Sequence, residues 1–421
     1  SPWNQRLRSP GGGDNLFLSS IVALKPDTGE YVWHYQTTPG DTWDFTATQH
    51  ILLADIDVGG ETRKVLMQAP KNGFFYVLDR TDGSLISAEP YVAVSWASAI
   101  DPANGRPIEA PNARYVDGPF LTMPSGLGGH NWHPMSYSPD TGLVYLPSQD
   151  IPAPYLEDAG FEHADGFWNT GVDFRMLETP ADPAMAAEVA KMVRGQLIAW
   201  DPVEQREAWR YQHLGPWNGG TLATAGGLVF QGSLVGEFAA YDAANGERLW
   251  VTDAQTGVAA APATYAVDGE QYVTVAAGWG SIFALLGGEA LASMGLTNRS
   301  RILAYKRGGS AALPELAPTA PQPMPEPPEQ TASADTIATG KSLYYQRCVA
   351  CHGVDVASGG ITPDLRYSRA EVHDAWDAIV LEGALRGRGM PAFDSIFDGD
   401  DSQAVRAFVI DAAQKAYARQ Q

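Results

Sequence analysis

Two cysteines and a histidine near the C-terminus carry the clearest chemical signal in the sequence. Residues 348–352 read Cys-Val-Ala-Cys-His, and this motif uses both cysteines of the chain. In such a C-x-x-C-H motif, two thiols can bond to the two vinyl groups of one porphyrin, and the adjacent histidine is held beneath the iron. The motif therefore predicts a c-type haem bonded to Cys348 and Cys351, with His352 as the proximal ligand of the iron.

A C-x-x-C pair can also serve as a redox disulfide or as half of a zinc site. A zinc site needs further soft ligands nearby, and the chain has no other cysteines. A thioredoxin-like motif needs a βαβ context, which the flanking residues do not show. Both of these interpretations are therefore weaker than haem attachment.

The second axial ligand of the iron is predicted to be a methionine. Met390 is the only methionine beyond residue 330, and it lies in the sequence Gly387-Arg388-Gly389-Met390-Pro391. Glycine and proline disfavour a regular element here, so the loop can bring a thioether to the iron, although methionine more often packs in a core. His373 is the competing ligand, but its context is typical of a solvated helix surface. Ligation by His352 and Met390 raises the haem potential and leaves no open position on the iron.

The haem segment is separated from the rest of the chain by residues 309–334. Seven prolines lie in this stretch, at positions 314, 318, 321, 323, 325, 327 and 328. Such a composition predicts an extended, semi-rigid and exposed linker. Three helical patterns follow it, over residues 335–347, 369–383 and 402–419, with Ser333 as a cap of the first. Residues 335–421 therefore resemble a class I cytochrome c domain.

Residues 1–308 have a different character, rich in glycine, tryptophan and tyrosine, with short alternating apolar runs between turn signals. A unit of strand, Asp-x-x-x-Gly turn, strand and tryptophan recurs along this part. The copies lie at residues 21–33, 197–209 and 238–250, and weaker ones at 75–83 and 138–142. Repeated units of this kind predict a β-propeller with long insertions, in which Trp33, Trp209 and Trp250 dock neighbouring sheets.

Several motifs together resemble one known family. They lie at residues 1–4 (Ser-Pro-Trp-Asn), 9–16, 43–49 (Trp-Asp-Phe-Thr-Ala-Thr-Gln), 69–73, 129–134 and 277–280. The chain resembles the pyrroloquinoline quinone (PQQ) dependent quinohaemoprotein alcohol dehydrogenases, in which an eight-bladed propeller precedes a cytochrome c domain. The resemblance implies a partial all-β propeller over residues 1–308, holding the later blades of the ring. The linker over 309–334 and a small all-α cytochrome c domain over 335–421 follow it.

The resemblance also implies an upstream part. In the family, an asparagine and a glutamate that bind calcium, an adjacent-cysteine disulfide and a tryptophan beneath the cofactor all precede the Ser-Pro-Trp motif. We therefore expect the chain to be the C-terminal part of a longer protein whose exporting signal lies upstream. An isolated part of a ring exposes strand edges and half of a cofactor pocket, so we expect activity to need the missing part.

The resemblance assigns catalytic roles to two residues. Asp44, in the Trp-Asp-Phe motif, corresponds to the general base and to a residue that contacts calcium. Composition alone gives a turn aspartate at this position. Lys71 corresponds to a cation beside the quinone carbonyl, where it stabilises developing negative charge. Lanthanide-using relatives carry a further aspartate two residues after the base, and this position is Thr46 here, so calcium is the predicted metal.

Further residues are predicted to bind PQQ. Asn131 and Trp132 match the family's cofactor-contacting loop, and Gly278 and Trp279 form a glycine-rich strand end where backbone can approach a planar ligand. The two histidines that flank the loop, at positions 130 and 133, are interpreted as buried and hydrogen-bonded.

Charge and hydropathy limit the partners of the chain. It carries 28 lysine and arginine residues against 49 aspartate and glutamate residues, a net charge of −21, so it lacks the basic footprint of a nucleic-acid binder. No apolar run is long enough to span a bilayer, so no transmembrane segment is predicted. Covalent haem is assembled outside the cytoplasm, and the family resemblance therefore implies a periplasmic protein.

Together these features predict an enzyme that oxidises small alcohols to aldehydes, passes two electrons to PQQ and then hands them singly to the haem. The downstream acceptor is a cytochrome, a copper protein or a quinone-linked protein. Three alternatives stay open. The first is a non-catalytic electron-transfer propeller with a cytochrome. The second is a dehydrogenase for a polymeric or cyclic alcohol, since the loops around Trp168 and Phe174 cannot be decoded. The third is the membrane-associated three-subunit relative, whose haem passes electrons to a cytochrome subunit.

Overall fold

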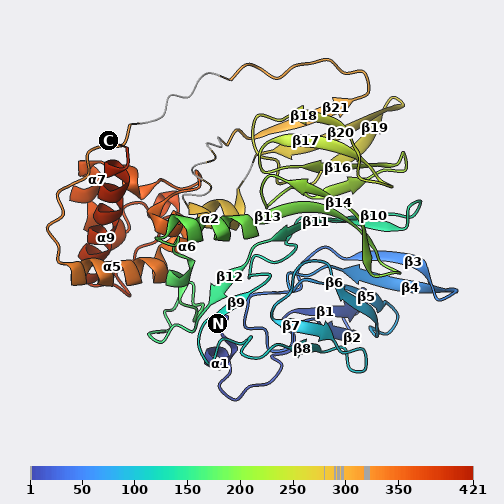
Figure 1. Ribbon diagram of the computed structural model, residues 1–421, viewed down its shortest axis with the longest axis horizontal. Coiled ribbons are helices and arrows are strands. Elements are labelled where there is room, and N and C mark those ends of the chain that lie inside the picture. The colour runs from blue at the N-terminus through green and yellow to red at the C-terminus, as the bar shows by residue number, and fades with distance from the viewer. Residues whose placement is uncertain are drawn as a thin grey trace.

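The computed structural model describes residues 2–278, 280–288, 291, 294, 298–316 and 323–420. Figure 1 shows a part built of strands and, beside it, a part built of helices. The last described strand, β21 (Arg301–Lys306), and the first helix of the second part, α5 (Ala334–Arg347), are joined by a long irregular segment. This arrangement agrees with the predicted fold class of a propeller followed by a helical domain.

Three sheets of the first part have four antiparallel strands each, joined in chain order, which is the form of a propeller blade. The first contains β3 (Leu52–Val58), β4 (Glu61–Gln68), β5 (Phe74–Asp79) and β6 (Leu85–Pro90). The second contains β10 (Ser136–Ser138), β11 (Leu143–Asp150), β13 (Arg194–Asp201) and β14 (Arg206–His213). The third contains β15 (Thr221–Ala223), β16 (Leu228–Gly232), β17 (Glu237–Asp242) and β18 (Arg248–Asp253).

The other sheets are smaller. Three strands form the sheet of β19 (Ala263–Val267), β20 (Glu270–Ala277) and β21. Pairs of strands are formed by β1 (Ser20–Leu24) with β2 (Tyr31–Gln36), β7 (Ala97–Ile100) with β8 (Pro107–Glu109), and β9 (Phe120–Thr122) with β12 (Ala153–Tyr155). The predicted long insertions are present between β12 and β13, where η1 (Phe174–Leu177) and α2 (Pro183–Met192) lie. Two short helices, α1 (Gln5–Arg8) and α3 (Ser281–Leu286), lie outside the sheets.

Aromatic rings of one sheet pack on turn glycines of the next. A Cβ atom on Gly83 would lie 2.5 Å from a ring carbon of Trp33, and one on Gly246 would lie 2.5 Å from a ring carbon of Trp209. Both glycines have positive φ and follow the aspartate of the repeat by four residues, so the turn motif and the docking ring work as one unit. The predicted docking role of Trp33 and Trp209 is confirmed.

Trp250 and one further ring complete this pattern. Trp250 lies edge-on to Tyr305 of the next sheet at 5.3 Å, although 39% of it is exposed. A further copy of the Asp-x-x-x-Gly turn lies at residues 101–105 and is not among the copies predicted from the sequence. The ring of Tyr35, instead of a tryptophan, packs on this turn. A Cβ atom on Gly105 would lie 2.9 Å from that ring.

The helical part packs around one apolar core. It contains α5, α6 (Val349–His352), α7 (Ala370–Asp374), α8 (Trp376–Val380) and α9 (Gly399–Ala418), with η2 (Val354–Val356), η3 (Leu365–Tyr367) and η4 (Arg386–Arg388) between them. Ser333 caps α5 as predicted, because its hydroxyl accepts a hydrogen bond from the Thr336 amide at 3.1 Å. The last helix begins three residues earlier than predicted, at a capping box formed by Asp398 and Asp401.

Two predictions about this part are wrong. The helix predicted over 369–383 is broken at Ala375, whose φ of −93° and ψ of 13° separate α7 from α8. His373 is 4% exposed rather than solvated, and its ring stacks on Trp376 at 5.8 Å. Desolvation lowers the pKa of His373 and so favours its neutral form. A neutral imidazole can be buried in apolar surroundings without the cost of burying a charge.

The proline-rich segment is attached at both ends. Figure 1 shows its first residues leaving β21 and its last residues reaching the helices, and residues 317–322 are outside the described part. Near its start, Gln255 donates to the carbonyl of Pro314 at 3.1 Å. Near its end, Gln414 donates to the carbonyl of Pro328 and Gln330 donates to that of Ala407, both at 2.8 Å. The predicted linker therefore follows the surface of α9 in its second half.

Hydropathy gives a separate result: among the helices of the described ranges, none combines the length and the apolar character needed to cross a membrane.

Trypsin should cut this junction at one place. Arg307 is exposed directly after β21, and the next lysine or arginine is Lys341 on α5, which is paired with Glu178. We expect the first cut after Arg307, giving a haem-bearing fragment that begins at Gly308, because exposed irregular backbone is cleaved before helices. Haem-stained gels of a time course measure this. Because Lys306 offers a second cleavable bond beside it, the double variant Lys306→Gln/Arg307→Gln should lose the fragment. A first cut at Lys341 would contradict the order.

Candidate functional site

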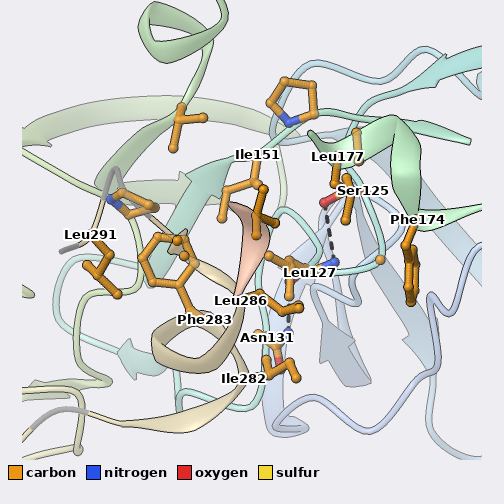
Figure 2. Close-up of a pocket in the computed structure, with 18 of the residues that line it drawn as sticks. Ser125, Leu127, Asn131, Ile151, Phe174, Leu177, Ile282, Phe283, Leu286 and Leu291 are labelled. Carbon is orange, nitrogen blue, oxygen red and sulfur yellow. Dashed lines mark hydrogen bonds between the residues drawn. The ribbon is translucent and has the colours of Figure 1, made fainter. Parts of the chain in front are cut away.

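A cavity of about 520 Å³ lies between the propeller and the helical part. Figure 2 shows α3 residues such as Phe283 and Leu286 on one side of it and the η1 residues Phe174 and Leu177 on the other. Asp44, Lys71 and Asn131 line it, so the structure brings three of the predicted site residues together. Val354 of η2 also lines it, and the cavity therefore reaches from Asp44 to the haem-binding part.

Asp44 and Lys71 form a direct ion pair in this cavity. The Lys71 ammonium donates to Oδ2 of Asp44 at 2.9 Å and to its main-chain carbonyl at 2.8 Å. Lys71 is only 9% exposed. Burial raises the pKa of Asp44, the Lys71 charge opposes this rise, and the nearby Asp41 charge adds to it. Of the described residues that line the cavity, only this pair is charged.

The loop that presents Asp44 is held by Asp41. One carboxylate oxygen of Asp41 accepts from the Trp43 amide and the other from the Phe45 amide, both at 2.9 Å. Asp44 itself has φ of +64°, in the left-handed region that non-glycine residues rarely adopt. The turn aspartate of this segment is therefore Asp41, and Asp44 is free of that role. Sequence reasoning missed Asp41, although its spacing from the amides it binds is a local signal.

Aromatic residues on either side of Asp44 fix the loop to the core. Trp43 and Phe45 are both fully buried, with ring centroids 5.3 Å apart, and each ring contacts Trp96. The Trp43 indole also donates to the carbonyl of Ala113 at 2.9 Å. Because its two neighbours are anchored, Asp44 is turned toward the cavity while the motif as a whole belongs to the core.

The predicted cofactor loop divides between two hollows. The Asn131 amide donates to the carbonyl of Leu127 and its oxygen accepts from the Trp132 amide, both at 2.8 Å, which fixes Asn131 at the first cavity. Trp132 is 46% exposed and lines a second hollow of about 570 Å³ together with Gly278. Trp279 lies outside the described residues. The structure thus places Trp132 and Gly278 together, in a different hollow from the one that Asp44 lines.

The histidines beside this loop are both buried, as predicted, but only one has its hydrogen bonds. His130 lies between the carbonyls of Ala69, at 2.8 Å, and of His133. Burial lowers the pKa of His133 to about 3, and its Nε2 has no partner in the described part of the chain. The ring of His133 stacks on Trp132 at 4.0 Å and meets Trp217 edge-on at 5.3 Å. His133 is therefore neutral, and its ring packs between those of Trp132 and Trp217.

In the second part, Cys351 and His352 lie on α6, and Cys348 is the residue that precedes this helix. Both thiols are free, and burial raises the pKa of Cys348 to about 12. Burial also lowers the pKa of His352, a change that the backbone of Pro363 partly opposes. Nδ1 of His352 is buried and has no partner of hydrogen-bonding geometry within the described ranges. A neutral buried imidazole beside two free thiols fits a covalently attached haem, with His352 as the iron ligand.

Met390 lies in the loop after η4, where Gly389 adopts φ of +95°. It is partly buried against the same apolar core as Cys348, together with Phe393. The residues from Gly389 to Ala392 form neither helix nor strand, as the glycine and proline residues predict. An irregular loop of this kind is expected to let the thioether reach the iron. Met390 as the second axial ligand stays a prediction.

Small residues bring the propeller close to the haem-binding segment. A Cβ atom on Gly359 would lie 2.1 Å from the carbonyl oxygen of Ala284 in α3. One on Gly288 would lie 2.8 Å from the carbonyl oxygen of Val354. On its other side, α3 stacks Phe283 on Trp217 at 5.5 Å with nearly parallel rings. One short helix therefore contacts both the propeller interior and the segment that follows the C-x-x-C-H motif.

Comparison with family models agrees with this geometry. A model described as glucose/ethanol/alcohol dehydrogenase, beta-propeller domain, matches residues 7–101 and 191–273. A model described as cytochrome C oxidase, cbb3-type, subunit III, matches residues 335–409. The fold and the two sites thus define a PQQ-type propeller joined to a c-type cytochrome domain.

Individual relatives show the same combination. The chain is 49% identical to quinohemoprotein alcohol dehydrogenase ADH IIB of Pseudomonas putida, over 99% of this chain and 59% of that protein. It is 45% identical to 1-butanol dehydrogenase (cytochrome c) of Thauera butanivorans, over 98% of this chain and 59% of that protein. The solved structure of ADHIIG from Pseudomonas putida HK5 superposes with a TM-score of 0.91 at 44% identity, covering 100% of this chain and 61% of that one.

The chain belongs to the quinohaemoprotein alcohol dehydrogenases, and it spans about three fifths of the length of these relatives. The predicted family and fold class are confirmed. The family match implies PQQ and haem c as cofactors, and calcium is typical of these enzymes.

The donors present suit PQQ better than calcium. A buried ammonium on Lys71 and apolar walls fit a planar anionic quinone. Calcium requires six to eight oxygen ligands. Across the ranges that the structure describes, no three or more His, Cys, Asp or Glu residues gather as a metal site. Asp44 is the one predicted calcium contact, and its Oδ2 is engaged by Lys71. The described residues therefore do not by themselves form the calcium site.

Replacing Met390 tests the axial ligand directly. In the haem-loaded protein, Met390→Ala should remove the thioether, leave the iron five-coordinate or water-bound, and lower the haem potential. Optical spectra and a redox titration measure the change. A matched control is Met324→Ala, which removes a buried methionine of the segment beside α9. An unchanged His/Met spectrum in Met390→Ala would contradict the assignment.

Proposed function

We propose that this chain carries the catalytic base, the quinone-binding cation and the haem of a PQQ-dependent alcohol dehydrogenase. The observation that carries the proposal is that one cavity is lined both by the pair of Asp44 and Lys71 and by Val354 of the haem-binding part. Substrate and redox cofactor held there lie between a proton acceptor and an electron acceptor. Alcohol oxidation requires both, since the hydroxyl proton leaves to a base, while the carbon-bound hydrogen leaves as a hydride that carries two electrons to the acceptor.

Different residues of the chain serve proton transfer and cofactor binding. The Asp44 carboxylate accepts the hydroxyl proton, and its raised pKa brings it closer to the working pH, where general bases are most effective. The Lys71 ammonium binds the anionic cofactor and stabilises negative charge that develops on its carbonyl oxygen. Asn131, which lines the same cavity, supplies a further contact to the cofactor. When bound, PQQ supplies the two-electron acceptor, and calcium held partly by Asp44 supplies a Lewis acid.

The substrate class follows from the cavity wall. The wall is mainly aromatic and aliphatic, with Trp3, Ile151, Trp168, Phe174, Leu177 and Leu234 among its residues. Burial of apolar surface favours alcohols with a hydrocarbon body over polyols. The relative from Thauera butanivorans, whose name gives 1-butanol as its substrate, supports a short primary alcohol. A polymeric alcohol fits a volume of about 520 Å³ poorly.

The non-catalytic alternative explains less of the site. A propeller that only supports a cytochrome has no need of a buried ammonium paired with a partly buried carboxylate, because desolvating a charge costs several kcal/mol per ion. The pair in the cavity is therefore better explained by chemistry on a bound substrate. We further propose a periplasmic location, since covalent haem attachment occurs outside the cytoplasm. A cytochrome, copper protein or quinone-linked protein then takes electrons from the haem.

The general base is tested by Asp44→Asn in a holoenzyme preparation loaded with PQQ, calcium and haem. The amide has the size of the carboxylate but cannot accept the hydroxyl proton, so turnover of 1-butanol should fall by about 10²–10⁴-fold. The haem spectrum and the PQQ content should be unchanged. Asp55→Asn, which changes an exposed aspartate of β3, is the matched control. Turnover within threefold of the parent in Asp44→Asn would rule out this mechanism.

The pH dependence should respond to Lys71. Asp44 works in its ionised form, so the rate rises with pH as the carboxyl loses its proton. The Lys71 charge lowers the pKa of Asp44, and Lys71→Met removes this effect. The acid limb of the kcat/KM profile should therefore move to higher pH at saturating PQQ. Lys25→Met, which removes an exposed pair with Glu30, should leave the profile in place. A limb that moves to lower pH would contradict the assignment of the base.

A further inference from the structure

One propeller insertion contacts both the cavity and the haem-binding part. We call residues 157–178, between β12 and α2, the interdomain loop. Figure 1 shows the green chain of this region beside the orange and red helices. Its aromatic residues Phe167 and Phe174 pack against the apolar core that contains Cys348, Met390 and Phe393.

Phe167 is the residue of this loop that reaches the predicted ligand segment. Its ring centroid lies 5.3 Å from that of Phe393, with an angle of 36° between the planes. Phe393 is 6% exposed and follows Met390 by three residues. Aromatic pairs at this separation contribute more than their buried area alone. The contact thus joins the propeller to the segment that carries the thioether.

The loop is built to hold Phe167 in place. The Asn169 side chain donates to the carbonyls of Ala164 and Phe167, at 2.8 and 2.9 Å, and accepts from the Ala164 amide at 2.9 Å. Trp168 points to the other side, where it lines the cavity and meets Trp3 edge-on at 5.1 Å. Phe167 is therefore fixed by its own backbone and by a neighbour anchored in the propeller.

Polar contacts flank this ring pair. Lys341 of α5 donates to Oε1 of Glu178 at 2.6 Å, and Arg347 donates to the carbonyl of Glu162 at 3.3 Å. Both are on the surface, where ion pairs and polar contacts contribute little to stability but fix orientation. These polar contacts join the interdomain loop to α5, whereas the apolar pair of Phe167 and Phe393 joins it to the segment after Met390.

The segment around Met390 is irregular backbone that follows the 3-10 turn η4. From its own side, the Met390 amide donates to the carbonyl of Leu385 at 3.4 Å and the Phe393 amide to that of Val380 at 2.9 Å. Such backbone opens more readily than packed elements. When it opens, the thioether leaves the iron. A ring that packs on Phe393 from outside opposes this opening.

We propose that Phe167 is a positioning residue for the haem: by packing on Phe393 it holds the Met390 segment closed and keeps the thioether on the iron. The inference rests on the proposed function, in which a haem ligated by His352 and Met390 receives the electrons. It adds that methionine ligation of the haem depends on a residue of the propeller. The haem therefore has its full potential only when the two parts are docked.

The experiment uses the haem-loaded protein and imidazole, a small ligand that competes with the thioether for ferric iron. The apparent affinity of such a ligand scales with the fraction of molecules in which the thioether has left. Phe167→Ala should therefore raise the imidazole affinity at least fivefold. Because methionine ligation raises the potential, the ratio of reduced to oxidised haem at a fixed potential should fall about threefold, which is about 28 mV for a one-electron couple.

Two controls separate positioning from general damage. Tyr265→Ala removes one ring of an exposed pair with Tyr272, also 5.3 Å apart, on the last described sheet, and should change neither quantity. Phe167→Leu keeps an apolar contact and should give an intermediate imidazole affinity. It also serves as the test variant if the alanine variant fails to load haem. Imidazole affinity and haem ratio within twofold of the parent in a folded Phe167 variant would overturn the proposal.

The result is independent of turnover. If Met390→Ala leaves the spectrum unchanged, the axial ligand of the proposed function is wrong. If Met390→Ala behaves as expected and the Phe167 variants do not, only the positioning role fails. Asp44→Asn should leave the imidazole affinity unchanged in either case, because it alters the base and not the haem segment.

Discussion

The packing of an aromatic ring on a turn glycine of the next sheet is the contact on which the propeller part depends. Trp33 on Gly83 and Trp209 on Gly246 leave no room for a Cβ atom, so the spacing between sheets is set by the absence of a side chain. The same turns need positive φ, which glycine adopts without cost. Sheets joined in this way keep a fixed relation to one another, and the loops at their ends are held around a common cavity.

The energetic cost of the site is concentrated in that cavity. Asp44 combines a left-handed backbone with a carboxylate whose pKa burial raises, and its partner Lys71 is a buried cation. A buried charge pair seldom adds to stability compared with apolar residues of the same size. Backbone strain at the same residue is likewise unfavourable. The surrounding aromatic core, above all Trp43 and Phe45, offsets these costs, which is why the motif has the form Trp-Asp-Phe.

Local chemistry made much of this structure predictable. The C-x-x-C-H motif, the Ser333 cap and the Asp-x-x-x-Gly turns are each specified within a few residues, and the structure contains all of them. Asp44, Lys71 and Asn131 could be grouped only through a family resemblance, because they are far apart in the sequence. The burial of His373 and the contact of Phe167 with Phe393 depend on how distant segments pack, and no local pattern indicates either.

Packing contacts of α3 and of the interdomain loop set the orientation of the helical part, and the proline-rich segment keeps the two parts close together. The proline-rich segment follows α9 through Pro328 and Gln330, so its second half moves with the helices and limits how far they can separate from the propeller. Contacts at Pro314, Pro328 and Gln330 anchor the segment on both parts, which raises the local concentration of one part at the surface of the other. Under that condition the modest contacts of α3 and of the interdomain loop suffice to define one docked arrangement. The proposed transfer of electrons from the cavity to the haem needs such an arrangement, because the cavity wall includes residues from both parts.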